Sequence, residues 1–134
     1  MRVLGIDFGS SRTGLALSDP MGVTCSPLET VEERDENRLL EKIVAVTRRE
    51  EVGEIVVGFP RPLGGGSNAQ SNAAVAFGTR LQAMTAVPVR MWDERFTSKL
   101  AAKGRKTQAA QDAIAACYML QSYLDSHAEH MEDS

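Results

Sequence analysis

Near its N-terminus the sequence reads RVLGIDFGSSRTGLALS over residues 2–18. Its first part, Arg2–Asp7, is apolar up to its final carboxylate, which is typical of a buried strand. Gly9–Gly14 predicts a turn, because its residues adopt unusual dihedral angles or bond their own backbone. Leu15–Ser18 predicts a second strand. The stretch is therefore expected to form a strand, a turn and a returning strand, with an acidic residue where the first strand ends.

The next segments extend this unit. Val23–Ser26 predicts a third strand, which we expect to be an edge strand that ends at Pro27. Apolar residues then recur at helical spacing and predict a helix from about Asp35 to Glu50. Glu54–Pro60 is a short, continuously apolar run of the kind that forms a strand covered on both faces.

The remainder alternates helix and strand. The predicted elements are a helix capped by Ser67 or Asn68 and extending to Met84, a strand over Pro88–Trp92, a short helix after Thr97, a last helix from about Gln111 to Ser126, and a frayed acidic tail over residues 127–134. Three strands followed by alternating helices and strands predict an α/β domain, residues 1–126, with a mixed sheet and helices on both faces.

Length and composition exclude several classes of protein. A chain of 134 residues, 43% hydrophobic and 25% charged, is one ordinary globular domain rather than a disordered, collagen-like or coiled-coil chain. Its longest charge-free run, Pro62–Thr79, is too polar to span a membrane. Asp7 interrupts any signal-peptide core. Cys25 and Cys117 are far apart in the sequence, so we expect reduced thiols in a cytoplasmic protein.

The distribution of charge along the chain says more about possible phosphate binding than the net charge of −3 does. Four of the 18 acidic residues lie in the last ten positions. By contrast, the segment Arg90–Lys106 holds six basic residues against Asp93 and Glu94. Such local basicity can dock phosphates, with Lys99 and Lys103 as candidate contacts. The alternative is an ordinary solvated helix face.

Carboxylates are expected at one edge of the sheet. Asp7 ends the first strand, Asp93 and Glu94 follow the last strand, and Asp112 begins the last helix. In an open α/β sheet, ligands bind beyond the carboxyl ends of the strands. Clustered carboxylates are costly without a cation, and their hard oxygens suit Mg²⁺ or Mn²⁺. Two such ions can activate water and stabilise the leaving oxygen in phosphodiester hydrolysis.

Each of these acidic residues also has a structural interpretation. Asp7 could cap the turn, and Asp112 could be a first-turn carboxylate that faces the helix dipole. Glu94 could pair with Arg90 or Arg95 on the surface.

The turn between the first two strands is a candidate phosphate site. Its backbone amides, together with Ser10, Ser11 and Arg12, could hold a phosphate. The alternative is a tight hairpin with no ligand.

Four segments together resemble the YqgF (RuvX) family, in the right order and over almost the whole chain. They are GIDFGSSRTGLALSD (5–19), VVGFP (56–60) with Gly64–Ser67 after it, DERFTS (93–98), and DAIAA (112–116) with LQSYLD (120–125).

The resemblance implies an RNase H-like fold: a five-stranded mixed sheet, order 3-2-1-4-5, with strand 2 antiparallel. It implies a metal-dependent nuclease, a hydrolase acting on ester bonds, that matures the 5′ end of precursor 16S rRNA in ribosome biogenesis. Asp7, Glu94 and Asp112 would be the catalytic, metal-binding carboxylates, with Asp93 in reserve. Arg95 would contact the phosphate, and Thr97 belongs to the same motif.

The sequence departs from related patterns at two places. Resolvases of the RuvC type carry a Glu on the middle strand, whereas here that strand ends in Gly58-Phe59-Pro60, so Glu94 must supply the second carboxylate. The segment Ser98–Gln111 is also shorter than in the family.

Three other functions stay open. A Holliday junction resolvase would act on branched DNA, and a homodimer is compatible with the resemblance because resolvases act as dimers. The run Asp7–Ser10 with Thr13-Gly14 also resembles the first phosphate motif of the actin-like ATPases, including sugar and acetate kinases, but those enzymes need two such domains. A non-catalytic RNA-binding assembly factor would keep the basic residues and tolerate loss of the carboxylates.

Overall fold

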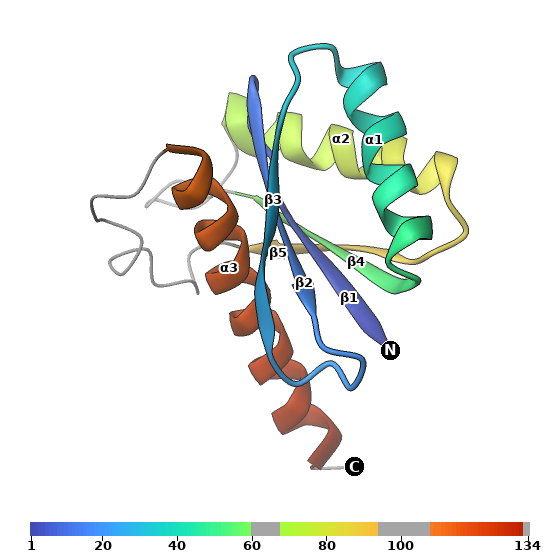
Figure 1. Cartoon of the computed structure of the whole chain (residues 1–134), viewed down its shortest axis with the longest axis vertical. Helices are drawn as coiled ribbons and strands as arrows, with labels where there is room; N and C mark the ends of the chain where they lie inside the picture. The colour runs from blue at the N-terminus through green and yellow to red at the C-terminus, as the bar shows by residue number, and fades with distance from the viewer. Residues whose placement is uncertain (60–67, 94–107, 133–134) are drawn as a thin grey trace.

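The computed structural model describes residues 1–59, 68–93 and 108–132 (Figure 1). Within these ranges the elements are β1 (Arg2–Asp7), β2 (Arg12–Ser18), β3 (Cys25–Glu32), α1 (Glu36–Arg49), β4 (Val52–Phe59), α2 (Ala69–Met84), β5 (Val89–Asp93) and α3 (Gln108–Glu132). The strands form one sheet in the order β3-β2-β1-β4-β5. β2 is antiparallel to β1 and β3, whereas β1, β4 and β5 are mutually parallel. The predicted mixed sheet and its strand order are confirmed.

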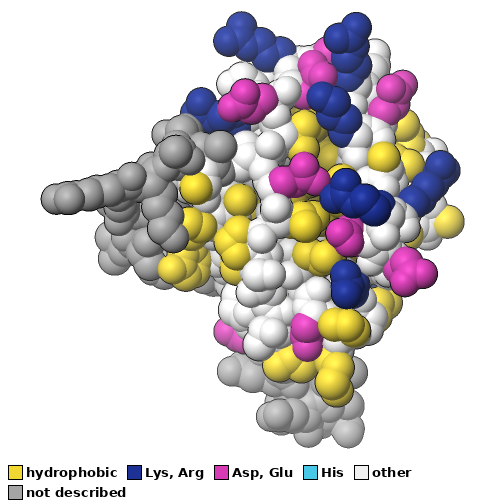
Figure 2. Space-filling view, viewed as in Figure 1, with side chains coloured by type: hydrophobic (Ala, Val, Ile, Leu, Met, Phe, Trp, Pro, Cys, Tyr) yellow, Lys and Arg dark blue, Asp and Glu magenta, His cyan; other side chains and the backbone are white. Residues whose placement is uncertain are grey.

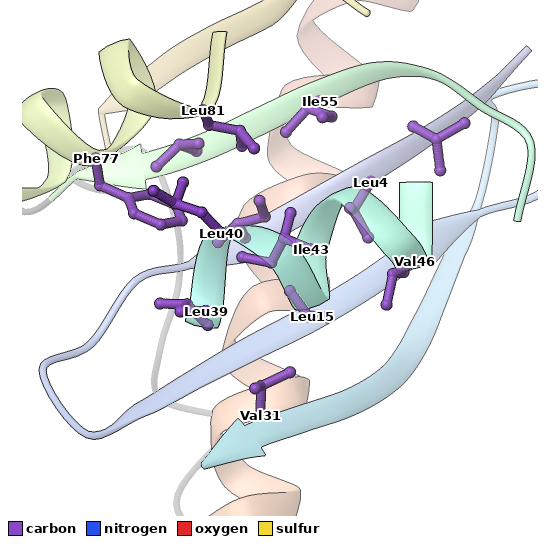
Figure 3. Close-up of a cluster of buried hydrophobic side chains, with 13 residues drawn as sticks. Leu4, Leu15, Val31, Leu39, Leu40, Ile43, Val46, Ile55, Phe77 and Leu81 are labelled. Atoms are coloured by element: carbon purple, nitrogen blue, oxygen red, sulfur yellow. The ribbon is translucent and has the colours of Figure 1, made fainter. Parts of the chain in front are cut away.

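The sheet is covered on both faces, by α3 on one side and by α1 and α2 on the other (Figure 1). The larger buried cluster joins the sheet to α1 and α2, and Figure 3 shows Leu4 and Leu15 near Ile43 there, with Phe77 beside Leu40. Each such side chain, when fully buried, stabilises the fold by about 1.5–3 kcal/mol. The second cluster lies under α3. Its members are Val3, Ala16, Val56, Ala116, Met119, Leu120, Tyr123 and Leu124.

Local signals start the first two helices at the expected places. The Asp35 side chain caps α1 by accepting hydrogen bonds from the backbone N–H groups of Asn37 and Arg38. Asn68 caps α2 in a reciprocal capping box with Ser71. Each cap satisfies N–H groups that have no partner within the helix, which stabilises the helix by about 1 kcal/mol.

A glycine in β1 sets how closely α3 approaches the sheet. A Cβ atom built on Gly5 would lie 2.8 Å from Cβ of Leu120. A larger residue would therefore push α3 away from β1. This close approach is what brings the first turns of α3 down onto the end of the sheet that carries Asp7.

Several predicted boundaries were wrong. β2 begins at Arg12, inside the predicted turn Gly9–Gly14, and β5 includes Asp93, which was expected to follow the strand. β3 does not end at Pro27 but continues to Glu32, and Pro27 is tolerated because β3 is an edge strand and the β2–β3 register shifts opposite it. α3 continues past Ser126 to Glu132, so residues 127–132, expected to be frayed, are helical. The His127 ring packs on Tyr123 at a centroid distance of 3.9 Å, which supports this extension.

Several predicted features lie outside the described residues. They are Glu94, Arg95, Thr97, Lys99, Lys103, the short helix after Thr97, and most of the glycine-rich loop before α2. In the part of the chain that the structure does describe, no helix is both long and apolar enough to cross a membrane.

Candidate functional site

Asp7 lies at the carboxyl end of β1 and on the face of the sheet covered by α3. Side chains alternate along a strand. Leu4 and Ile6 belong to the cluster under α1 and α2, whereas Val3 belongs to the cluster under α3. Gly5 is in contact with α3 as well. Position 7 therefore shares the α3 face, in the middle strand of the sheet.

Asp7 has a glycine on each side within the sheet. Its register partners are Gly14 on β2 and Gly58 on β4. Gly14 is also the residue on which α3 begins to pack, since a Cβ atom there would lie 2.0 Å from the backbone oxygen of Asp112. The structure therefore brings Asp7 and Asp112 to the same edge and the same face of the sheet. Asp7 lies next to Gly14 within the sheet, and Asp112 packs over Gly14 from α3.

Asp112 forms an ion pair with Arg12. The Nε atom of Arg12 donates a hydrogen bond to Oδ2 of Asp112 at 3.0 Å. The two side chains keep 42% and 22% of their surface exposed, so both can still meet a ligand from solvent. α3 begins at Gln108, and its first turn holds no acidic residue. The interpretation of Asp112 as a first-turn carboxylate facing the helix dipole is therefore wrong.

The turn that leads from Asp7 to Arg12 is tightly closed. Gly9 approaches Arg12 so closely that a Cβ atom would lie 2.1 Å from the Arg12 carbonyl oxygen. The Thr13 hydroxyl lies 3.4 Å from both the N–H and the carbonyl oxygen of Gly9. Phe8 anchors the turn by stacking on Phe77 at a centroid distance of 4.5 Å. Arg12, the first residue of β2, is thus held directly after a short, anchored turn rather than on a long loop.

The serines of the turn are open to solvent to different degrees. Ser10 is exposed and Ser11 is half-buried. Ser11 also lines an open hollow of about 400 Å³, together with Arg12, Glu32, Glu33 and Arg34. This hollow places a second arginine near Arg12. It also places two glutamates there, so the hollow is not purely cationic.

Charges of both signs mix on the face of the molecule seen in Figure 2, where Lys and Arg side chains are interspersed with Asp and Glu. The described part of this face thus carries no large single-sign field. The predicted basic segment Arg90–Lys106 lies mostly outside the described residues.

Asp93 faces away from Asp7. It pairs in register with Phe59 at the end of β5 and is 8% exposed. Met91, two residues before Asp93, packs against the cluster under α1 and α2. The residue between them, Trp92, packs against the cluster under α3. By strand alternation Asp93 shares the face of Met91. The structure therefore places Asp7 and Asp112 together and puts Asp93 on the opposite face.

The oxygen donors at this edge suit a hard divalent cation. Carboxylate oxygens are the ligands that Mg²⁺ and Mn²⁺ prefer. Asp7 and Asp112 supply two carboxylates from separate elements. Among the described residues no group of three His, Cys, Asp or Glu side chains could hold a metal, and Glu94 lies outside them. The donor chemistry of the two aspartates therefore fits a metal site that needs a further ligand.

Sequence reasoning missed the pairing of Arg12 with Asp112 and the role of Gly14 as the seat of α3. Gly14 was assigned to the predicted turn, whereas it lies inside β2, where a glycine signals close backbone approach. The partner in that approach could not be inferred, because it comes from a helix nearly a hundred residues later.

The sequence matches the family described as RuvX, Holliday junction resolvase, over residues 1–126. A protein of Clostridium kluyveri named as a pre-16S rRNA nuclease is 35% identical over 93% of this chain and 97% of its own length. A protein of Moorella thermoacetica with the same name is 38% identical over 93% of this chain and 95% of its own length.

Solved structures share the fold at low sequence identity. RuvC of T. thermophilus, solved in complex with a Holliday junction substrate, superposes with a TM-score of 0.64 at 16% identity, covering 95% of this chain and 96% of that chain. The fowlpox virus Holliday junction resolvase superposes with a TM-score of 0.58 at 13% identity, covering 94% of this chain and 99% of that chain.

Proposed function

The chain belongs to the RuvX family, and we propose that it is a divalent-metal-dependent nuclease that processes the 5′ end of precursor 16S rRNA. Relatives that align over 93% of this chain are named as pre-16S rRNA nucleases. They are bacterial, so the proposed place of action is the cytoplasm, where bacterial ribosomal RNA is made. The observation that carries the proposal is the placement of Asp7 and Asp112 at one edge and on one face of the sheet.

In this proposal Asp7 and Asp112 hold Mg²⁺ or Mn²⁺ through their carboxylate oxygens. Two bound ions would supply an activated water and stabilisation of the leaving oxygen in phosphodiester hydrolysis. Asp7 extends from the central strand of the sheet, and Asp112 from a helix packed directly on Gly14. Both carboxylates thus extend from packed secondary-structure elements rather than from loops, which favours a precise metal site.

Glu94 is the proposed third carboxylate, ahead of the reserve candidate Asp93. The support is the alternation of β5, in which Met91 and Asp93 share one face while Arg90 and Trp92 share the α3 face with Asp7. Asp93 therefore faces away from Asp7, which leaves Glu94, outside the described residues, as the preferred candidate.

Arg12 has two roles in the proposed mechanism. Its Nε–H group orients the carboxylate of Asp112. A guanidinium carries five N–H donors in a planar fork, so the remaining donors can bind a phosphate of the substrate. Ser10 and Ser11 on the same turn add hydroxyl and backbone donors, and Arg95, Thr97, Lys99 and Lys103 are proposed further contacts.

The test is a cleavage assay with a precursor 16S rRNA fragment and a four-way DNA junction, with and without Mg²⁺ or Mn²⁺. Asp7→Asn keeps the shape of the side chain and removes its charge, so metal-dependent cleavage should fall about 10³-fold or more. Folding should be unaffected, because neutralising one member of a carboxylate cluster relieves repulsion in the metal-free protein.

The matched control is Asp35→Asn, the same change at the N-cap of α1, where Asn caps as well as Asp. It should cleave like the wild type. Asp7→Asn that also cleaves like the wild type would remove Asp7 from the mechanism. Cleavage of the junction but not the RNA would indicate a resolvase, and RNA binding without cleavage by the wild type would indicate an assembly factor.

A further inference from the structure

The two cysteines of the sequence meet in the fold. Cys25 begins β3 and Cys117 lies within α3, 92 positions later. Their Sγ atoms are 3.2 Å apart, and both are free thiols. The two cysteines are far apart in the sequence but are direct neighbours in the fold.

The backbone around the two thiols is held on both sides. The Cys25 thiol also lies 3.1 Å from the carbonyl oxygen of Cys117, to which it can donate. Cys25 pairs with Ser18 at the end of β2. One turn after Cys117, Gln121 donates a side-chain hydrogen bond to the carbonyl oxygen of Val23 at 2.9 Å. The start of β3 and the middle of α3 are therefore kept together by contacts besides the thiols.

The thiols are near enough to bond and open enough to react. A disulfide has an S–S length of about 2.05 Å, so closure requires the sulfurs to approach by roughly 1 Å. Both cysteines are half-buried rather than enclosed, so a small reagent can reach them from solvent.

We propose that Cys25 and Cys117 form a reversible dithiol–disulfide site that cross-links edge strand β3 to α3 when the protein meets a low-molecular-weight disulfide such as oxidised glutathione. The proposal is independent of the nuclease activity and of any metal.

The chemistry balances in two exchange steps. The Cys117 thiolate attacks one sulfur of the glutathione disulfide, forms a mixed disulfide and releases one glutathione thiolate, which takes up a proton. The Cys25 thiol loses its proton, attacks the Cys117 sulfur and releases the second glutathione. The two protein thiols are oxidised by two electrons, and one glutathione disulfide is reduced to two glutathione thiols.

The environment assigns the order of attack. The hydrogen bond from the Cys25 thiol lowers the pKa of Cys117 to about 7. The same bond, together with burial and the nearby charges of Cys117 and Asp125, raises the pKa of Cys25. An attacking thiol works best when its pKa lies near the ambient pH. With Cys25 taken as the donor of the S–H···S bond, in which either sulfur can donate, we assign the first attack to Cys117 and the resolving step to Cys25.

The disulfide should stabilise the protein markedly. A cross-link that closes a loop of this length restricts the unfolded chain strongly. We expect the melting temperature of the oxidised protein to exceed that of the reduced protein by about 10 °C. Dithiothreitol should reverse the shift.

The experiment treats the reduced, full-length protein at low concentration with oxidised glutathione, blocks remaining thiols with N-ethylmaleimide and maps the peptides by mass spectrometry. We expect a monomer that has lost two hydrogens, carries no blocking group, and yields one peptide containing Cys25 linked to one containing Cys117. The Cys25→Ser variant retains a hydroxyl donor to Cys117 but cannot resolve, so it should stop at the glutathione adduct on Cys117.

The proposal is overturned if the wild type ends with glutathione on both cysteines, with disulfide-linked dimers that increase with protein concentration, or with both thiols still free. The peptide map of the wild type decides this alone, whether or not the serine variant folds.

Discussion

Arg12 and Asp112 join the first residue of β2 to α3 through a 3.0 Å hydrogen-bonded ion pair. Because both side chains are partly exposed, water screens the pair, and its contribution to the free energy of unfolding is at most about 1 kcal/mol. Its larger effect is geometric. It holds in place the carboxylate that we propose as a metal ligand, and it keeps a guanidinium beside that carboxylate.

Replacing Arg12 with Ala should therefore affect function more than stability. We expect the melting temperature to fall by only a few degrees, because the lost pair is partly exposed. RNA affinity should fall, and the log–log slope of affinity against salt should flatten by roughly 0.7, the value of one phosphate contact on a single strand. Binding titrations over a series of salt concentrations measure both quantities.

Arg49→Ala is the matched control. Arg49 forms a more exposed ion pair with Glu29 at 3.1 Å, at the C-terminal end of α1. Its loss should cost similar stability and leave the salt slope unchanged. Equal salt slopes of RNA affinity for Arg12→Ala and the wild type would show that Arg12 does not contact a phosphate and only holds α3 in place through Asp112.

Gly14→Ala should damage stability and cleavage together. Its Cβ atom would overlap the backbone oxygen of Asp112 at 2.0 Å, and backbone cannot turn aside as a flexible side chain can. Such overpacking costs about 1–3 kcal/mol or more. The start of α3 must move away from β2 and take Asp112 with it. We expect a lower melting temperature and strongly reduced metal-dependent cleavage at a temperature where the variant is folded.

Gly22→Ala separates the two effects. Gly22 has a φ of 70° in the turn between β2 and β3, so an alanine is strained there and costs about 1 kcal/mol or more. This turn lies at the opposite end of β2 from Arg12. The variant should lose stability but keep wild-type cleavage when folded. If both glycine variants cleave equally well, the seating of α3 on Gly14 does not position the site.

Tyr123→Phe should lower stability through the loss of a partly buried hydrogen bond. The Tyr123 hydroxyl donates to Oε1 of Glu54 at 2.8 Å, and Tyr123 is 3% exposed. Removing the hydroxyl leaves the Glu54 carboxylate without this donor, which should lower the free energy of unfolding by about 1 kcal/mol. The exposed Tyr118 on the same helix gives the control, Tyr118→Phe, which should be nearly neutral.

The difference in stability between the wild type and Tyr123→Phe should depend on pH, and the pKa of Tyr123 gives the direction of that dependence. Burial, followed by the hydrogen bond to Glu54 and its charge, raises the pKa of Tyr123 above its usual value near 10. The folded protein then retains a proton that the unfolded chain loses above about pH 10. The stability advantage of the wild type over Tyr123→Phe is therefore full below pH 10 and should shrink above it. A constant advantage in unfolding titrations at pH 8 and pH 11 would contradict this assignment.

The sequence predicted the layout of the fold better than the contacts between distant elements. The apolar run ending at Asp7, the cap at Asp35 and the capping residue Asn68 are local signals, and the structure confirms the elements they predict. The strand order came from resemblance to a family. Pro27 misled the prediction because a missing N–H group ends a central strand but not an edge strand.

Contacts between elements that are distant in the sequence could not be predicted from it. Arg12 with Asp112 and Cys25 with Cys117 both depend on where α3 crosses β2 and β3. That crossing is set by the glycines under the helix, and periodicity along the chain does not encode it. The same holds for the acidic pair Asp93 and Glu94: Asp93 ends β5, and only the register of that strand tells whether its carboxylate can share a face with Asp7.

That acidic pair gives the last prediction. Asp93 lies on the face of Met91, opposite Asp7, while the α3 face of β5 carries Trp92. We therefore expect Asp93→Asn to retain cleavage within about tenfold of the wild type, as for a residue that supports a metal site without binding the ion. Glu94→Gln should reduce cleavage about 10³-fold, because it removes a proposed metal ligand. Single-turnover rates at saturating Mg²⁺ measure both, and Asp7→Asn sets the baseline. The reverse ranking would make Asp93 the third carboxylate, and would require the end of β5 to rotate when the substrate or the metal binds.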